Sequence, residues 1–263
     1  MGKRRLTVLA GSALIGATAC SAASPPPAES ATSTAIAVNC PNIDLRILTA
    51  VEGGAERPMC INGLWNFVVP GVDKPANPRR SELFVVQDGR PITGREGQTL
   101  HQEFDITPNL GPAGADDRQW HIVWQLHGPT NGEWKPPPVA LRIRNGQLAL
   151  TGGAGWPGHN WTTANHEWLQ PLTPIRDGET YRVIVDVYLS ADTGKAWVSG
   201  SVNGRRVVDR WHPVSRAGYR SGTIYPGQAA VASRIGLYRG SQGAAPPKTT
   251  QVITQRIIDA RSS

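Results

Sequence analysis

The sequence predicts an all-β fold, a sandwich or jelly roll of antiparallel sheets, and three observations lead to it. Segments that alternate apolar and polar residues recur at short intervals, with turn residues between them. The chain has 29 glycines and 22 prolines but only 18% charged residues, which favours turns over long helices. No long helical period, phosphate-binding glycine loop or internal repeat runs through the 263 residues.

Each strand is predicted from its own alternation. Two hairpins are expected, because an Asn-Gly pair favours a tight turn: one spans 137–153 and turns at Asn145-Gly146, and the other spans 195–211 and turns at Asn203-Gly204. The remaining predicted strands are 65–71, 81–89, 99–106, 120–128, 180–190, 232–240 and 250–260.

The N-terminus predicts export. Residues 1–19 read as a signal peptide, with a basic start, an apolar run and the small-residue site Ala17-Thr18-Ala19. The apolar run is short for a membrane-spanning helix. With Cys20, the site resembles a bacterial lipobox, which implies a lipid on that cysteine. Ala17 stands where Leu is usual, so the expected location is either the outer face of the cell membrane or the medium.

Composition divides the rest of the chain. Residues 20–39 are rich in Ser, Pro and Ala and are predicted to be a tether, and 40–263 are predicted to be the folded domain. The chain has three cysteines. If Cys20 carries lipid, Cys40 and Cys60 remain to form a disulfide in an oxidising compartment; two free buried thiols are the alternative.

Charge and ligand spacing bound the possible partners. The formal charge is +7, and removal of Lys3, Arg4 and Arg5 with the signal peptide would leave 7 − 3 = +4. This excess suits an acidic partner, or it is only a soluble basic surface. No cysteine pair has zinc-ligand spacing and the histidines are scattered, so neither a metal nor another cofactor is predicted.

The stretch WHIVWQLHG (120–128) raises a functional question, because one face of the strand carries an amide and an imidazole. The alternation predicts that Trp120, Ile122, Trp124 and Leu126 face the core and that His121, Val123, Gln125 and His127 face away. In the next strand Arg142 and Arg144 alternate with Leu141 and Ile143. We expect Gln125, His127, Arg142 and Arg144 to share a sheet face, with Tyr188 on the polar side of a further strand. Such a face suits an acidic sugar chain; a solvated outer face is the alternative.

Three separated motifs resemble those of the jelly-roll polysaccharide lyases, the class of alginate lyases, glucuronan lyases and heparin-lyase-I-like enzymes. They are RSEL (80–83), QLH (125–127) and RIGLYR (234–239), in the order of that family and spread over most of 60–260. The resemblance implies a concanavalin A-like β-jelly-roll of two antiparallel sheets. It also implies a substrate, an acidic polysaccharide of uronic acids, rather than nucleic acid. The domain is expected to be a monomer that meets the membrane only through a lipid at Cys20.

The resemblance assigns roles by position. Lyases remove the C5 proton of a uronate and expel the C4 oxygen, so the site must neutralise the carboxylate as charge develops. Arg80 and Gln125 match the neutralising positions. Tyr238 would be the acid, or both acid and base; His127 would be the base, or a further stabiliser of the carboxylate. Arg142, Arg144, Tyr188, Arg234 and Arg239 are the expected substrate-binding residues.

The chain departs from the family pattern at three positions. Phe84 stands where the family has a second arginine after RSEL, Leu126 is the middle residue of QLH, and Arg234 replaces the usual lysine. The missing arginine puts substrate affinity in doubt.

Two other classes compete. A non-catalytic carbohydrate-binding lipoprotein of the same fold would use exposed tryptophans, for which Trp134, Trp156, Trp161 and Trp168 are candidates, although several are expected to cap the core. A glycoside hydrolase would need paired carboxylates. The nearest match begins at Glu103 and Asp105, but Pro108 stands where the second catalytic Glu belongs, which disfavours hydrolysis.

Overall fold

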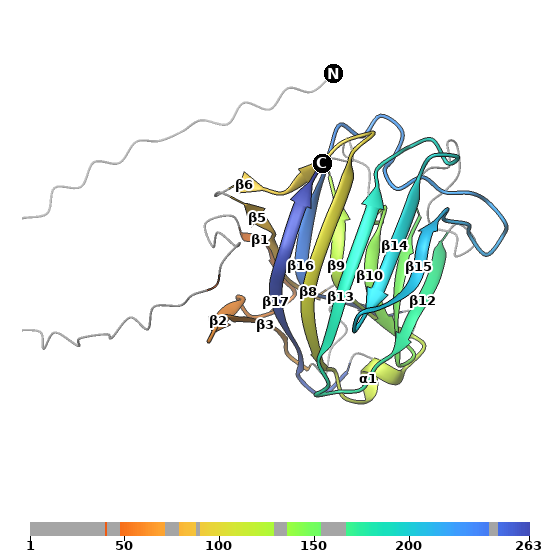
Figure 1. The fold of residues 1–263 in the computed structure, drawn as a ribbon. Helices are drawn as coiled ribbons and strands as arrows, with labels where there is room; N and C mark the ends of the chain where they lie inside the picture. Colours follow the sequence, from red (N-terminus) through yellow and green to blue (C-terminus); the bar gives the residue numbers. More distant parts are fainter. Residues whose placement is uncertain are drawn as a thin grey trace, which may run out of the picture. The chain divides into compact units, whose positions relative to one another are not determined.

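Two antiparallel sheets pack face to face in the computed structural model, with β17, β8, β13 and β14 drawn in front of β16, β9 and β10 (Figure 1). The structure describes residues 40, 48–71, 79–87, 90–128, 136–153, 167–241 and 247–263. The sandwich lies within one compact unit, Ala37–Ser263.

The first sheet, sheet A, has the strand order β1-β4-β16-β9-β10-β11-β12, and β7 also pairs with β16. Its strands are β1 Leu48–Glu52, β4 Arg79–Phe84, β7 Thr93–Gly94, β9 Gln119–His127, β10 Ala140–Arg144, β11 Gln147–Gly152, β12 Trp168–Pro174 and β16 Val231–Ser241. Because β16 lies between β4 and β9, a C-terminal strand joins two strands from the first half of the chain.

The second sheet, sheet B, has the strand order β15-β14-β13-β8-β17-β3-β2. Its strands are β2 Met59–Ile61, β3 Leu64–Val69, β8 Thr99–Asn109, β13 Tyr181–Tyr188, β14 Trp197–Val202, β15 Arg205–Trp211 and β17 Gln251–Ser262. A small pair, β5 Val86–Gln87 with β6 Arg90–Pro91, and a short helix, α1 Pro112–Ala115, complete the described elements. The predicted all-β jelly-roll sandwich is confirmed.

The predicted hairpins form where the Asn-Gly pairs stand. Asn145 and Gly146 have φ of 51° and 64°, and Asn203 and Gly204 have φ of 51° and 77°. Positive φ at both central residues is the type I′ geometry, whose twist matches that of the flanking strands. The turns therefore connect β10 to β11 and β14 to β15 at the predicted positions.

The core lies between the sheets and contains large apolar side chains from both. Trp124, Phe67 and Phe104 are among its largest fully buried members. A polar bridge crosses it: Trp124 Nε1 donates to Ser233 Oγ, which donates to the Gln102 side-chain oxygen, each over 2.9 Å. Because these buried polar atoms are paired, the bridge fixes β9 and β16 of sheet A against β8 of sheet B.

Strand β9 does not alternate as predicted. Trp124 pairs with Ile235 and Leu141, which belong to the core, whereas Ile122 pairs with Tyr238 and Arg142 on the opposite face. The register shifts between these positions, so Val123 and Trp124 both belong to the core. The predicted core face is therefore wrong for Trp120 and Ile122. His121 takes an interior place instead, fully buried, with Nε2 2.9 Å from the Gln251 amide nitrogen of β17.

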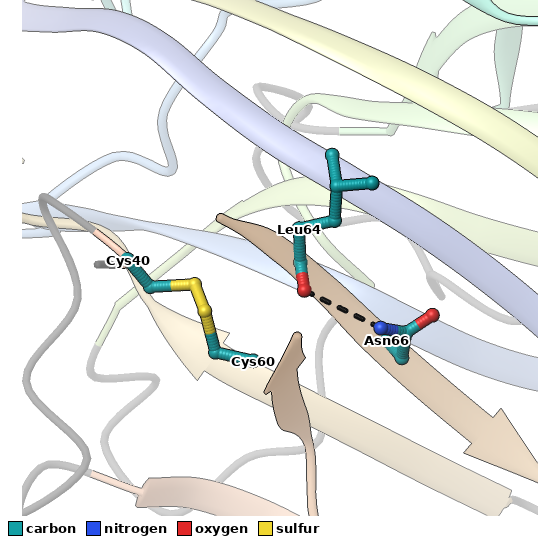
Figure 2. Close-up of a disulfide and its surroundings, with 4 residues drawn as sticks. All are labelled: Cys40, Cys60, Leu64 and Asn66. Atoms are coloured by element: carbon teal, nitrogen blue, oxygen red, sulfur yellow. Dashed lines mark hydrogen bonds between the residues drawn. A yellow bond between two sulfur atoms is a disulfide. The ribbon is translucent and has the colours of Figure 1, made fainter. Parts of the chain in front are cut away.

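Cys40 and Cys60 form a disulfide whose Cα atoms lie 6.3 Å apart, beside the turn of the β2–β3 hairpin (Figure 2). In the adjacent strand the Asn66 amide donates to the Leu64 carbonyl over 3.3 Å. The bridge closes a 20-residue separation in sequence. It attaches the start of the domain to an edge strand of sheet B.

The predicted signal peptide, lipid site at Cys20 and tether lie outside the described residues. Within the described ranges, no helix has the length and apolar character needed to cross a membrane.

Candidate active site

The three motifs come together on the outer face of sheet A, the face turned away from sheet B. RSEL lies on β4, RIGLYR on β16 and QLH on β9, and these three strands are neighbours. The register pairs Tyr238 with Arg80 and Arg234 with Gln125. Because paired residues of antiparallel strands project to the same side, these four side chains share one face.

Arg80 and Tyr238 are in direct contact. The guanidinium carbon of Arg80 lies 4.6 Å from the centre of the Tyr238 ring. Trp120 meets the same ring edge-on, with centroids 5.0 Å apart and an interplanar angle of 86°. The phenol is thus held between a cation and an indole, and such contacts restrict its orientation.

Beneath them, Glu82 and Gln125 form the buried floor of the site. Both residues are 1% exposed, and the Gln125 amide Nε2 donates to Glu82 Oε1. The second carboxylate oxygen lies 3.7 Å from Arg80 Nη1. One buried carboxylate therefore contacts both residues that sequence analysis assigned to neutralise the substrate.

Phe84, at the position that sequence analysis compared with a second arginine of the lyases, contacts the guanidinium of Arg234. The Arg234 guanidinium carbon lies 4.9 Å from the centre of the Phe84 ring. The register pairs Arg234 with Phe84 on one side and with Gln125 on the other. The Phe84 ring thus contacts and orients the arginine of the next strand.

His127 is electrically neutral near pH 7. Burial, followed by the positive charges of Arg234 and Arg80, lowers the pKa of the His127 imidazole from 6.5 to about 4. These cations disfavour a third positive charge on this face. A neutral imidazole can donate one hydrogen bond and accept another.

His127 and Tyr238 stand apart along the strands. His127 pairs with Ala232, and Tyr238 pairs with Ile122. On β9 the two pairing positions are separated by 127 − 122 = 5 residues, which is about 16 Å of strand at about 3.3 Å per residue. Arg80 lies at the Tyr238 end, because the two residues pair in register, and Gln125 lies between the two ends.

The two arginines of β10 share this face but have partners of their own. Arg142 pairs in register with Ile122, is 7% exposed and donates to the Glu167 carboxylate. Arg144 donates to the Asp117 backbone carbonyl. The expected shared face of Gln125, His127, Arg142 and Arg144 thus forms, with the β10 arginines one strand beyond β9.

Two predicted substrate-binding residues do not reach this face. Arg239 is 3% exposed and lies between the sheets, where Nη1 donates to the Gln251 side-chain oxygen over 3.0 Å. Its position next to Tyr238 in a regular strand turns it to the opposite side. Tyr188 lies on β13 of sheet B, stacked on Trp197 with centroids 6.0 Å apart. The prediction that Arg239 and Tyr188 line the site is therefore wrong.

Sequence reasoning assigned no role to Glu82 or Trp120. Glu82 stands two residues after Arg80, so strand alternation already put both on one face. Trp120 carried no such signal, because its side depends on the irregularity in β9.

Of the residues named for the two competing classes, those that the structure describes lie away from this face. Trp168 is fully buried, and its ring lies 5.6 Å from that of Trp211, so it belongs to the core; Trp134, Trp156 and Trp161 lie outside the described residues. Asp105, on β8 of sheet B, bonds to Arg182 and Arg256, far in the topology from β4, β16 and β9. In the described part of the chain, no group of three or more His, Cys, Asp or Glu residues could hold a metal ion.

Comparison with solved structures shows the fold. An endo-β-1,4-glucuronan lyase from the fungus Trichoderma reesei aligns with 84% of this chain and 93% of its own, with a TM-score of 0.55 and 12% identity. The alginate lyase AlyC3 covers 76% of this chain and 75% of its own at 8% identity and a TM-score of 0.48. The marine PL7 alginate lyase AlyA1 from Zobellia galactanivorans covers 78% and 79% at 16% identity and a TM-score of 0.45.

Sequence comparison adds no assignment: no protein-family model matches the chain, and no curated protein matches it. At 12% identity, the glucuronan lyase shows that the chain has the β-jelly-roll architecture of that enzyme. The chemistry must be argued from the site itself.

Proposed function

We propose that this protein is an exported polysaccharide lyase that cleaves a uronic-acid-containing polysaccharide by β-elimination. One observation supports it above the others: Arg80, Gln125, His127 and Tyr238 come from three distant segments and lie on one face of adjacent strands. The glucuronan lyase likeness adds support at the level of the fold. The disulfide suits a protein that folds in an oxidising compartment.

Carboxylate neutralisation is the first task of such a site. Loss of the C5 proton leaves an electron pair that spreads into the adjacent carboxylate, which then carries nearly two negative charges. Arg80 and Arg234 supply positive charge, and the Gln125 amide is a donor with one N–H already fixed on Glu82. Donors held in place before the reaction stabilise this charge without reorganisation.

Proton transfer falls to Tyr238 in this proposal. The phenolate takes the C5 proton, the electron pair forms the C4–C5 double bond, and the C4–O bond breaks. The phenol then returns a proton to the leaving oxygen. Two observations favour this assignment over a histidine base: His127 has its pKa lowered to about 4, which makes it a weak base, and it stands five residues from the position that pairs with Tyr238.

His127 then acts as a neutral donor to the carboxylate. It follows Gln125 by two residues on the same strand, so both project to the same side. Its neutral form retains a ring N–H for the substrate. This role agrees with the lowered pKa of His127, because donation to an anion needs the N–H and not the extra proton.

The function is tested with the purified domain and a panel of uronate polymers, including glucuronan and alginate. The expected result is ultraviolet absorbance from the unsaturated product on at least one polymer, abolished by Tyr238→Phe. Binding without absorbance would instead support the non-catalytic carbohydrate-binding class. New reducing ends without absorbance would indicate hydrolysis and contradict the proposal.

A further inference from the structure

Glu82 is a buried carboxylate in the middle of the candidate site to which the proposed reaction assigns no task. It is 1% exposed, and it lies on β4 between Arg80 and Phe84 on the outer face of sheet A. Burying a carboxylate is costly unless its oxygens meet donors or cations. The residues that meet this one are Gln125 and Arg80, both assigned to the substrate carboxylate.

The hydrogen bond between Glu82 and Gln125 fixes the orientation of the amide. A carboxylate accepts and does not donate, so only the NH2 end of the amide can face Glu82. The amide oxygen, Gln125 Oε1, is buried without a hydrogen-bond partner among the described residues. A rotated amide would oppose two oxygens, so Glu82 excludes the rotated form and leaves the second N–H in a set direction.

Space for Glu82 is created on the neighbouring strand. Gly236 pairs with Glu82 in register, at a φ of 152°. A Cβ at position 236 would lie 2.7 Å from Glu82 Cα and 2.9 Å from Glu82 Cγ. The absence of a side chain at Gly236 in RIGLYR thus leaves the space that Glu82 of RSEL occupies, so the two motifs are in direct contact.

We propose that Glu82 is a positioning residue, which holds the Gln125 amide and the Arg80 guanidinium in the geometry that receives the substrate carboxylate. This inference rests on the proposed lyase function and assigns part of its preorganisation to a residue that need not touch the sugar. Small displacements of such donors reduce rates by about 100-fold. Removing Glu82 therefore lowers kcat more than it raises KM.

The experiment compares wild type with Glu82→Ala, Glu82→Gln and the control Glu103→Ala. Glu103 is also a strand glutamate beside an arginine, 3.3 Å from Arg182, but on sheet B. We expect Glu82→Ala to lose about 100-fold in kcat with KM changed by less than about threefold. Glu82→Gln keeps an oxygen acceptor for the Gln125 N–H, so it recovers kcat to within about tenfold of wild type, and Glu103→Ala matches wild type.

An activity-independent measurement accompanies the kinetics. The side-chain NH2 signals of Gln125, assigned in 15N spectra by their loss in Gln125→Ala, exchange slowly with water in wild type and in Glu82→Gln. In Glu82→Ala they exchange fast. If Glu82→Ala does not fold, the wild-type Gln125 signals still test the inference, because fast exchange of these signals in wild type would overturn it.

Several results would overturn the inference. Among them are wild-type kcat in Glu82→Ala, equal losses in Glu82→Ala and Glu82→Gln, and Gln125 signals that are unchanged in Glu82→Ala. If wild type cuts no uronate polymer, the proposed function fails, while the Gln125 signals still decide whether Glu82 positions the amide.

Discussion

The outer faces of the two sheets carry the same kinds of side chain in different arrangements. On sheet B, Arg182 reaches Asp105 at 2.5 Å and Glu103 at 3.3 Å, and Arg256 reaches Asp105 at 2.5 Å. Although burial opposes it, hydrogen bonds from these two arginines hold the pKa of Asp105 below its ordinary value. Positive charge on that face is matched by neighbouring carboxylates.

At the candidate site on sheet A, two cations lie against aromatic rings. Arg80 covers Tyr238 and Arg234 covers Phe84, while Glu82 lies 3.7 Å from Arg80 and Arg142 of β10 is paired with Glu167. An aromatic ring orients a guanidinium without cancelling its charge. The contrast teaches that residue type alone does not define a site, because the same arginines can lie among carboxylates or against aromatic rings.

The largest expected difference between the faces is in catalysis. Arg80→Ala should reduce kcat/KM by about 100- to 1,000-fold, because a preorganised cation at the developing charge is lost. Arg182→Ala, on sheet B, should leave kcat/KM within about twofold. Initial rates of unsaturated-product formation measure both, and equal losses in the two variants would remove the distinction between the faces.

Close packing at Gly236 predicts the next largest effect. A Cβ there would lie 2.2 Å from the Ser81 carbonyl oxygen, so Gly236→Ala should lower the free energy of unfolding by about 3 kcal/mol. Gly178→Ala is the control, because Gly178 also has positive φ, 79°, but nothing within 4 Å of the added Cβ. Urea unfolding measures the free energy of unfolding of both variants. An equal decrease in the two would mean that backbone strain, and not the close contact with Ser81, destabilises Gly236→Ala.

The free energy of unfolding should fall in acid because of a histidine buried between the sheets. Burial, followed by the charge of Arg239, lowers the pKa of His121 from 6.5 to about 4. The unfolded chain takes up this proton first, so the stabilisation is complete above pH 6.5 and about 3 kcal/mol is lost as the pH falls towards 4. Chemical unfolding at pH 7 and at pH 4.5 measures the loss.

One substitution tests this effect. His121→Gln should reduce the acid loss without abolishing it, because the pKa of His127 is also lowered to about 4 and contributes in the same direction. An acid loss equal to that of wild type in His121→Gln would assign the loss to other groups.

A smaller effect on kcat/KM distinguishes a hydrogen-bond donor from a general base at His127. His127→Asn retains an N–H donor and should lose about tenfold in kcat/KM, while His127→Ala should lose clearly more. Because the pKa of His127 is lowered to about 4, its protonation should not reduce the rate near pH 6. The pH profile of kcat/KM tests this: an acidic limb near pH 6.5 that disappears in His127→Asn would contradict the lowered pKa.

Local patterns predicted most of the longer strands and both Asn-Gly turns, because alternation and Asn-Gly pairs depend on neighbouring residues only. The strands β1, β2 and β12 were not predicted. The sequence also predicts the sheet face on which Arg239 lies. Arg239 directly follows Tyr238, so in a regular strand its side chain points to the opposite face, towards the core. Glu82 could likewise have been placed with Arg80. Strand alternation alone, applied to every residue of the motifs, would have placed both Arg239 and Glu82 correctly.

Other features depend on pairing between distant strands. The irregularity in β9 lies where its register with β10 and with β16 shifts. No local pattern in WHIVWQLHG indicates this shift. Tyr188 alternates correctly within its own strand, but alternation cannot say which sheet that strand joins. The contact between Arg234 and Phe84 likewise depends on the register of β4 with β16.

The most direct test of the central claim compares Tyr238→Phe with Tyr188→Phe. Both remove one phenolic hydroxyl, the first from the site on sheet A and the second from the stacked pair on sheet B. On the polymer that wild type cuts best, unsaturated-product absorbance should appear at least about 1,000-fold more slowly with Tyr238→Phe. Tyr188→Phe should match wild type, and a Tyr238→Phe variant that retains wild-type rates would contradict the account.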